Sequence, residues 1–187
     1  VVGVVGEIYV KYNSFSNHGV VRWLMEHGVE VVPPAITGFF STSIPNAFIN
    51  REQHIRKDGL KPWQAKLVNR LLLHYAHVYD RLCGDYPFYR PFADIMDIWR
   101  KSRRVINSAA DFGEGWFLPG EICDLADHGI HKVVSLQPFG CIANHIISKG
   151  IERRYKDLYP HLSLLFLDFD AGTSDANITN RLHFLLQ

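Results

Sequence analysis

Cys141 is the side chain in this sequence whose type and position are best suited to chemistry. It follows an apolar run at residues 131–136 and a turn at residues 137–140, and it precedes a helical pattern. Unpaired backbone N–H groups at the start of a helix stabilise a thiolate. Such a thiolate could ligate a metal, attack an electrophile or simply pack in the core. His145 could share a helical face with Cys141, but two ligands are too few for a metal site.

The other cysteines and histidines give weaker patterns. Cys83, Cys123 and Cys141 are widely spaced and form no CxxC, which argues against a disulfide framework and against a self-contained zinc or iron–sulfur site. A reducing cytoplasm is the natural compartment for such a chain. His74 and His77 could form a metal pair on a helix, but no third ligand lies beside them at helical spacing, and a solvated pair is the commoner arrangement.

Known catalytic fingerprints are missing from the chain. It has no GxxxxGK[ST] phosphate-binding loop, and Gly113-Glu114-Gly115 neither follows a strand nor opens a strand–helix–strand unit. No nucleophile elbow with a following acid and histidine is present, so an α/β-hydrolase is unsupported.

The elements that must position these residues alternate between strand and helix. Apolar runs at residues 1–5, 29–32, 131–136 and 162–169 predict strands, and periodic segments at residues 20–27, 116–128, 144–159 and 176–186 predict helices. This alternation predicts an α/β fold with an open, doubly wound parallel sheet of about four strands. The expected strand order is 2-1-3-4, which is flavodoxin-like or Rossmann-like.

A mostly helical insertion is predicted at residues 35–112. A long helix should begin at Pro62 and end before Gly84, with an apolar stripe, and a second helix should begin near Pro91. We interpret residues 1–187 as one α/β domain. Because the chain opens inside an apolar run without a methionine, we expect it to be excised from a longer protein.

Ligands of such sheets bind beyond the carboxyl ends of the strands, where polar residues and glycines collect. The candidate binding residues follow the first, third and fourth strands, although each loop alone could be an ordinary turn or cap. They are Glu7, Asn17, Gln137, Gly140, Asp170 and Gly172, with Cys141 as the candidate metal ligand.

Composition excludes several classes of function. Twenty basic and 19 acidic residues give a formal charge of +1 with no block of like charge, which argues against nucleic-acid binding. No apolar run approaches the ~20 residues that span a bilayer, so no membrane partner is expected.

Four segments carry a resemblance to a known family. They are VVGVVGEIYVKYNSFSN (1–17), GEGWFLPGEI (113–122), LQPFGCIANHIISKGI (136–151) and LDFDAGTSDANITNRLHFLL (167–186). They resemble the uncharacterised region that follows the ATPase part of large CoA-substrate-specific enzyme activases. These are similar to 2-hydroxyacyl-CoA dehydratases and their activators, including the 2-hydroxyglutaryl-CoA and benzoyl-CoA reductase systems. Residues 35–105 match only loosely.

The resemblance implies a role in reductive activation. In such systems an ATP-hydrolysing activator delivers a low-potential electron, and a partner holds a [4Fe–4S] cluster through cysteines from separate Rossmann-like domains. The cysteine of QPFGC is Cys141, and the resemblance implies that it is one ligand of the cluster. The remaining cysteine ligands would lie upstream, in the other domains of the parent chain. The ATPase would lie there as well. The isolated chain should then hold no cluster and show no catalysis.

Two alternatives remain open at this point. The chain could be a non-catalytic flavodoxin-like module that binds a CoA ester or a nucleotide at the same loops. It could also be an interdomain scaffold whose aromatic-rich insertion docks another domain. The aromatic residues in question are Trp63, Tyr75, Tyr79, Tyr86, Phe88, Tyr89, Phe92 and Trp99.

Overall fold

A computed structural model gives the fold of the chain, and it describes residues 1–55 and 59–187. The predicted helical insertion at residues 35–112 therefore lies partly outside the described residues. Within them, four parallel strands form one sheet in the order β2-β1-β3-β4. The strands are β1 (Val2–Gly6), β2 (Val31–Val32), β3 (Lys132–Pro138) and β4 (Ser163–Phe169). The predicted fold class and strand order are confirmed.

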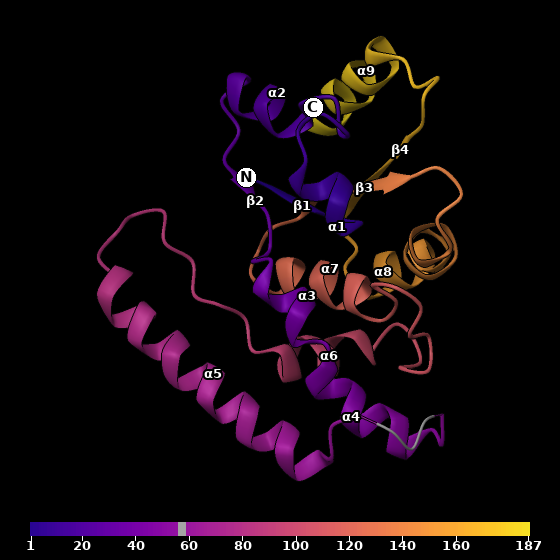
Figure 1. Ribbon diagram of the computed structural model, residues 1–187. Helices are drawn as coiled ribbons and strands as arrows, with labels where there is room; N and C mark the ends of the chain where they lie inside the picture. The colour runs from indigo at the N-terminus through magenta and orange to yellow at the C-terminus, as the bar shows by residue number, and fades with distance from the viewer. Residues whose placement is uncertain (56–58) are drawn as a thin grey trace.

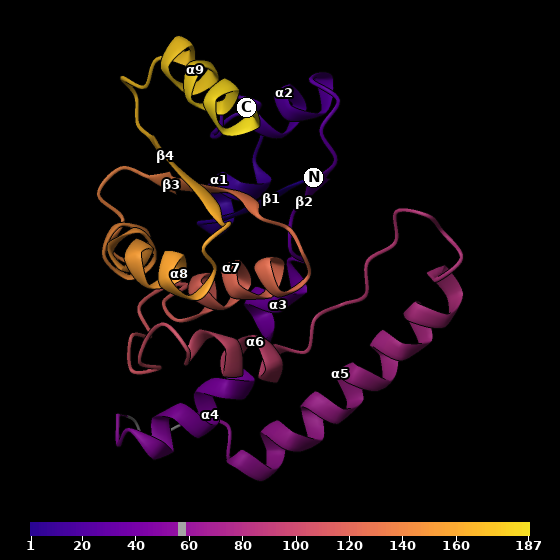
Figure 2. The ribbon, with the colours of Figure 1, turned by 180° about the vertical axis from the view of Figure 1, so that it is seen from behind.

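Buried apolar side chains explain why these segments form a sheet covered on both faces. All five residues of β1 are buried, as are the five central residues of β3. Runs of this kind suit parallel strands, which helices cover on both sides. One face carries α1 (Ile8–Tyr12), α2 (Val20–Glu26) and α9 (Asp175–Leu186). The other carries α7 (Phe117–Asp127) and α8 (Glu152–Leu158), as Figures 1 and 2 show.

Gly6 closes β1 in a conformation that requires glycine. Its φ is +132°, and a Cβ there would lie 2.0 Å from the carbonyl oxygen of Leu136 on β3. The missing side chain lets the backbone turn away from the sheet directly into α1. The sequence pattern did not predict α1, because Ile8, Tyr9 and Val10 continue the apolar run of the strand.

The segment at residues 35–112 forms a helical layer outside α7. It contains α3 (Thr37–Ser41), α4 (Ser43–Glu52), α5 (Pro62–Cys83) and α6 (Ile95–Ser102). Its own core joins Ile44, Ile49, Ile98 and Trp99 to Trp116 at the start of α7. The long α5 crosses the outer side of this layer, far from the sheet (Figures 1 and 2). No helix among the described residues is long and apolar enough to cross a membrane.

The helix predicted at residues 144–159 is present but irregular. It begins as the π-helix η1 (Ala143–Ser148), passes through a 3-10 turn (Lys149–Ile151) and continues as α8. A π-helical turn is rare and occurs often at functional sites. Here it begins two residues after Cys141.

Candidate functional site

Residues 1–17, 113–122, 136–151 and 167–186 contact one another at the carboxyl edge of the sheet. The amide of Glu7 donates to the carbonyl of Leu136 at 2.9 Å, and the amide of Ile8 donates to Glu114 Oε1 at 3.1 Å. A Cβ on Gly113 would lie 3.7 Å from that of Ala143, so the Gly113–Gly115 loop lies beside the start of η1. The crevice between β1 and β3 is the point where the strand order reverses, which is the usual ligand site of open α/β sheets.

Cys141 lies at this edge, one turn beyond the end of β3. It is partly exposed, and its Sγ accepts a hydrogen bond from Nδ2 of Asn144 at 3.1 Å. Asn144 is fully buried, and its Oδ1 has no hydrogen-bond partner among the described residues. A buried amide oxygen without a donor costs about 1–3 kcal/mol. Asn144 thus contacts the sulfur through its amide nitrogen, and its amide oxygen remains free to accept a hydrogen bond.

A second polar cluster lies beside Cys141 and joins β3, β4 and η1. His145 Nε2 lies 3.0 Å from Asp168 Oδ1, and Lys149 Nζ lies 3.6 Å from Asp168 Oδ2. Gln137 Nε2 also donates to Asp168 Oδ1, while the buried Gln137 Oε1 has no partner within the described part of the chain. An imidazole in contact with a carboxylate can hold and move a proton. The cluster thus places charged and hydrogen-bonding side chains close to Cys141.

Gly140 belongs to the same edge. It adopts a left-handed φ of +78°, and its amide lies 3.3 Å from His145 Nε2. The ring of His145 thus lies between the backbone of Gly140 and the carboxylate of Asp168.

The other predicted binding residues have structural contacts of their own. The side chain of Glu7 caps α1 by accepting from the amide of Val10 at 2.8 Å. Asn17 is buried and donates from Nδ2 to the carbonyl of Val10 at 2.8 Å. Both residues shape the loop after β1, and each has a hydrogen-bond partner inside it.

Asp170 and Gly172 form a tight turn after β4. Oδ1 of Asp170 accepts from the amide of Gly172 at 2.8 Å and from the hydroxyl of Thr173 at 3.0 Å. The turn is exposed and directly follows Asp168, so it lies beside the cluster that Asp168 forms with His145 and Lys149.

A buried ion pair joins the edge to α7. Nζ of Lys11 in α1 lies 3.2 Å from Oε1 of Glu121, and their side chains are 4% and 0% exposed. Burial raises the pKa of Glu121 above its ordinary value, although the charge of Lys11 and its hydrogen bond oppose the shift. Burial also raises the pKa of the neighbouring Tyr12, with a further contribution from the charge of Glu121. The pair fixes α1, and hence the loop after β1, against α7.

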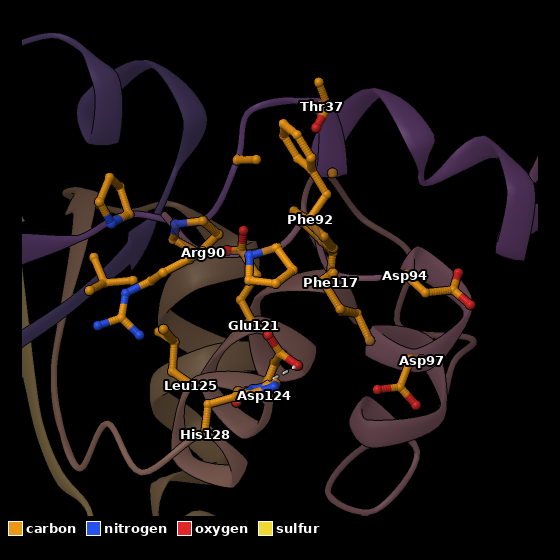
Figure 3. A pocket seen from close by; sticks show the side chains of 18 of the residues that line it. Thr37, Arg90, Phe92, Asp94, Asp97, Phe117, Glu121, Asp124, Leu125 and His128 are labelled. Atoms are coloured by element: carbon orange, nitrogen blue, oxygen red, sulfur yellow. Dashed lines mark hydrogen bonds and ion pairs between the residues drawn. The ribbon is translucent and has the colours of Figure 1, made fainter. Parts of the chain in front are cut away.

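A pocket of about 650 Å³ opens beyond the end of β2, between α7 and the segment that leads into α6 (Figure 3). Its lining is mainly apolar and includes Phe92, Phe117 and Leu125. Charged groups at its edge are already paired: Arg90 lies 2.6 Å from Glu30, and Asp124 lies 2.6 Å from Lys101. No motif indicated this pocket, because its walls come from segments far apart in the sequence.

Other candidate metal residues are not gathered into a site. Cys123 is buried in the core, and burial raises the pKa of its thiol to about 11. His74 and His77 lie exposed on α5, and Cys83 lies at its end. Across residues 1–55 and 59–187, no three histidine, cysteine or acidic side chains are placed to hold a metal ion. Sequence reasoning overlooked Asn144 and Lys149, although Asn144 lies three residues after Cys141, a spacing that permits contact along a helix.

Comparison with known proteins identifies no relative of this chain. No family model, no curated protein and no solved structure matches this chain. The sheet and the residues at its carboxyl edge define an open, parallel α/β protein with a thiol-containing site at its topological switch point.

Proposed function

We propose that this chain is one domain of a longer cytoplasmic redox protein of the CoA-substrate-specific activase type. In this proposal Cys141 is one ligand of a [4Fe–4S] cluster, and other domains of the parent chain supply the remaining ligands and the ATPase. The partners are those domains, rather than nucleic acid or a membrane. A cluster held there would supply single electrons at low potential.

The position of Cys141 carries the proposal. Its thiol is partly exposed at the switch point of the sheet, and Asn144 donates a hydrogen bond to the sulfur. Hydrogen bonds to cysteine sulfur stabilise the thiolate that binds iron and tune the potential of a cluster. The four family-like segments contact one another near this edge, through Ile8 with Glu114, Gly113 with Ala143 and His145 with Asp168, which supports a common role for them.

The residues present fit a cluster only in part. A [4Fe–4S] cluster takes four ligands, and the described residues place one thiol at this edge. Gln137 and Asn144 surround it with buried amides, each with an oxygen that lacks a partner within the described residues. The residues present therefore suit a chain that supplies one cluster ligand, Cys141, and the polar side chains beside it.

Protection of cysteines from alkylation tests the proposal in the longer protein. The protein is prepared anaerobically with and without iron and sulfide, treated with iodoacetamide and digested for mass spectrometry. We expect Cys141 to be labelled in the metal-free protein and protected in the iron-loaded protein. Cys83, which is also partly exposed, serves as the internal control and should be labelled in both. Equal labelling of Cys141 in the two preparations would refute the assignment.

Binding of an acyl-CoA is a second candidate, favoured by the pocket beyond β2. Its apolar lining suits an acyl chain, and the guanidinium groups of Arg90 and Arg100 lie at its edge for phosphates. Both are engaged by carboxylates, Arg90 by Glu30 and Arg100 by Asp97, so a phosphate would have to displace these partners. Calorimetric titration of the chain with butyryl-CoA should show binding that Arg90→Glu abolishes. Equal heats of binding of butyryl-CoA by the wild-type chain and by Arg90→Glu would refute this candidate function.

A further inference from the structure

A groove of about 540 Å³ lies between α5 and the helices α4 and α6. Figures 1 and 2 show α4 beside the first turns of α5, on the side of the helical layer that is remote from the sheet. None of the residues that line the groove belongs to the site around Cys141 or to the pocket beyond β2. The groove is therefore a separate feature of the molecule.

One wall of the groove is apolar. Ile44 and Phe48 line it from α4, and Met96 lines it from α6. Ile44 is 1% exposed, and Phe48 and Met96 are half-buried against the same core. A ligand in the groove would thus meet an apolar surface that the packing of the helical layer already holds in place.

The opposite wall comes from α5 and is basic. It contains Lys66, Arg70, His74 and His77. Their intervals of four, four and three residues place them on one face of the helix, and Leu73 lies among them on that face. We call these four residues the basic wall. His74 and His77, which suggested a metal pair in the sequence, belong to it.

The positive charge of the basic wall has no counter-charge within the described part of the chain. Lys66 and Arg70 are exposed, and neither forms an ion pair with a described residue. No acidic side chain among the described residues lines the groove. The acidic residue of α5, Asp80, accepts a hydrogen bond from the hydroxyl of Tyr89 at 2.7 Å, and Asp94 caps α6. The groove should therefore attract an anion.

The dimensions of the groove indicate what kind of anion fits. From Lys66 to His77 the helix rises about 16 Å, at about 1.5 Å per residue. A volume of about 540 Å³ over that length gives a mean cross-section of roughly 33 Å². A helix about 10–12 Å wide has a cross-section of roughly 80–110 Å², so a partner helix is too wide to enter. A single extended alkyl chain is narrow enough.

We propose that this groove binds a free single-chain anionic amphiphile of the fatty-acid type. Its charged head would pair with Lys66 and Arg70, which lie one helical turn apart. Its alkyl chain would lie along Phe48, Leu73 and Met96, where it is removed from water. This inference depends neither on the proposed cluster nor on binding of an acyl-CoA in the pocket beyond β2.

Calorimetric titration with three small molecules tests the proposal. Decanoate carries both the chain and the charge, decan-1-ol only the chain, and acetate only the charge. We expect decanoate to bind at one site per chain, at least roughly tenfold more tightly than decan-1-ol, and acetate to give no binding. The affinity for decanoate should fall as the salt concentration rises.

Substitutions test whether the groove is the binding site. Lys66→Glu/Arg70→Glu should weaken decanoate binding by roughly tenfold or more, because two attractions become repulsions. Leu73→Asp, which places a carboxylate in the groove, should also weaken it. The matched controls are Leu71→Asp, at a 53% exposed residue outside the groove lining, and Arg153→Glu, at an exposed arginine that is unpaired within the described residues. Both should bind decanoate as the wild type does, and circular dichroism verifies that each variant is folded.

Several results would overturn the proposal. They are no saturable binding of decanoate, equal affinity for decanoate and decan-1-ol, and unchanged binding by Lys66→Glu/Arg70→Glu. Binding that is lost in Arg90→Glu alone would place decanoate in the pocket beyond β2 instead. Binding to vesicles of phosphatidylcholine and phosphatidylglycerol without binding of free decanoate would assign the groove to a membrane surface. Binding of a glutamate-rich leucine helix without binding of decanoate would assign it to a partner protein.

Discussion

Replacing Lys11 by methionine should remove the cation from the buried ion pair that joins α1 to α7. The carboxylate of Glu121 is then left in a site where its side chain is 0% exposed. Breaking a buried pair by removing one partner costs roughly 3–5 kcal/mol. The matched control is Lys156→Met, which removes an exposed pair with Glu152 one helical turn away and should cost at most about 1 kcal/mol.

The pH dependence of this loss has a defined sign. Burial already raises the pKa of Glu121 with Lys11 present, and without Lys11 the pKa of the folded state rises further above the unfolded value of about 4.3. Between these two pKa values the folded state holds a proton that the unfolded state has released. The stability of Lys11→Met should therefore fall by up to about 1.4 kcal/mol per pH unit as the pH rises. Adding Glu121→Gln should remove this slope.

Equilibrium unfolding in urea, followed by tryptophan fluorescence between pH 5 and pH 8, measures both effects. The wild-type chain, Lys11→Met, Lys156→Met and the double variant Lys11→Met/Glu121→Gln are compared at each pH. The reasoning is refuted if Lys11→Met costs no more than Lys156→Met at pH 7. It is equally refuted if the free energy of unfolding of Lys11→Met increases with pH over this range.

Three further changes test other parts of the structure. Gly6→Ala should abolish folding or lower the melting temperature sharply, because the added Cβ would overlap β3. At Gly28 an added Cβ meets no atom within 4 Å, so Gly28→Ala should lower the free energy of unfolding by only about 1–2 kcal/mol, the cost of a left-handed backbone conformation. Thermal melts compare the two variants. Because burial raises the pKa of its thiol to about 11, Cys123 should resist iodoacetamide at pH 8 until the chain unfolds; rapid labelling of the native chain would contradict its burial. Asn144→Leu removes a hydrogen bond worth about 1 kcal/mol from the sulfur of Cys141, so alkylation of Cys141 at fixed pH should slow by roughly fivefold, and an unchanged rate would show that this bond is not formed in solution.

The sheet was predictable because its signals are local. Strand β4 is a nearly continuous apolar run, and β3 is centred on Val133, Val134 and Leu136. Gly6, Gly129 and Pro160 lie at or just beyond the ends of the elements that precede them. The connections between parallel strands then restrict the order of the sheet. The same pattern did not predict α1, because the apolar side chains that follow Gly6 suit either a strand or a helix. Contacts of α1 with Asn17 and Glu121, which no local pattern shows, stabilise the helix.

The site was only partly predictable for a physical reason. The position of Cys141 just after a strand could be predicted, because both the strand pattern and the cysteine are local features of the sequence. The contacts that define its surroundings join residues far apart in the chain, such as Ile8 with Glu114 and His145 with Asp168. The apolar stripe of α5 was visible as a period, but a period does not indicate whether the stripe faces the core or the solvent. In the structure it faces outward.

Iron content tests the assignment of Cys141 most directly. The proposal assigns this chain to a longer protein, and that protein is to be purified and reconstituted anaerobically as wild type, as Cys141→Ser and as Cys83→Ser. Iron and sulfide are then counted per polypeptide. Loss of one cluster, about four iron atoms, from Cys141→Ser, with full content in Cys83→Ser, is the result that this account predicts. Full iron content and an unchanged absorption spectrum in Cys141→Ser would contradict it.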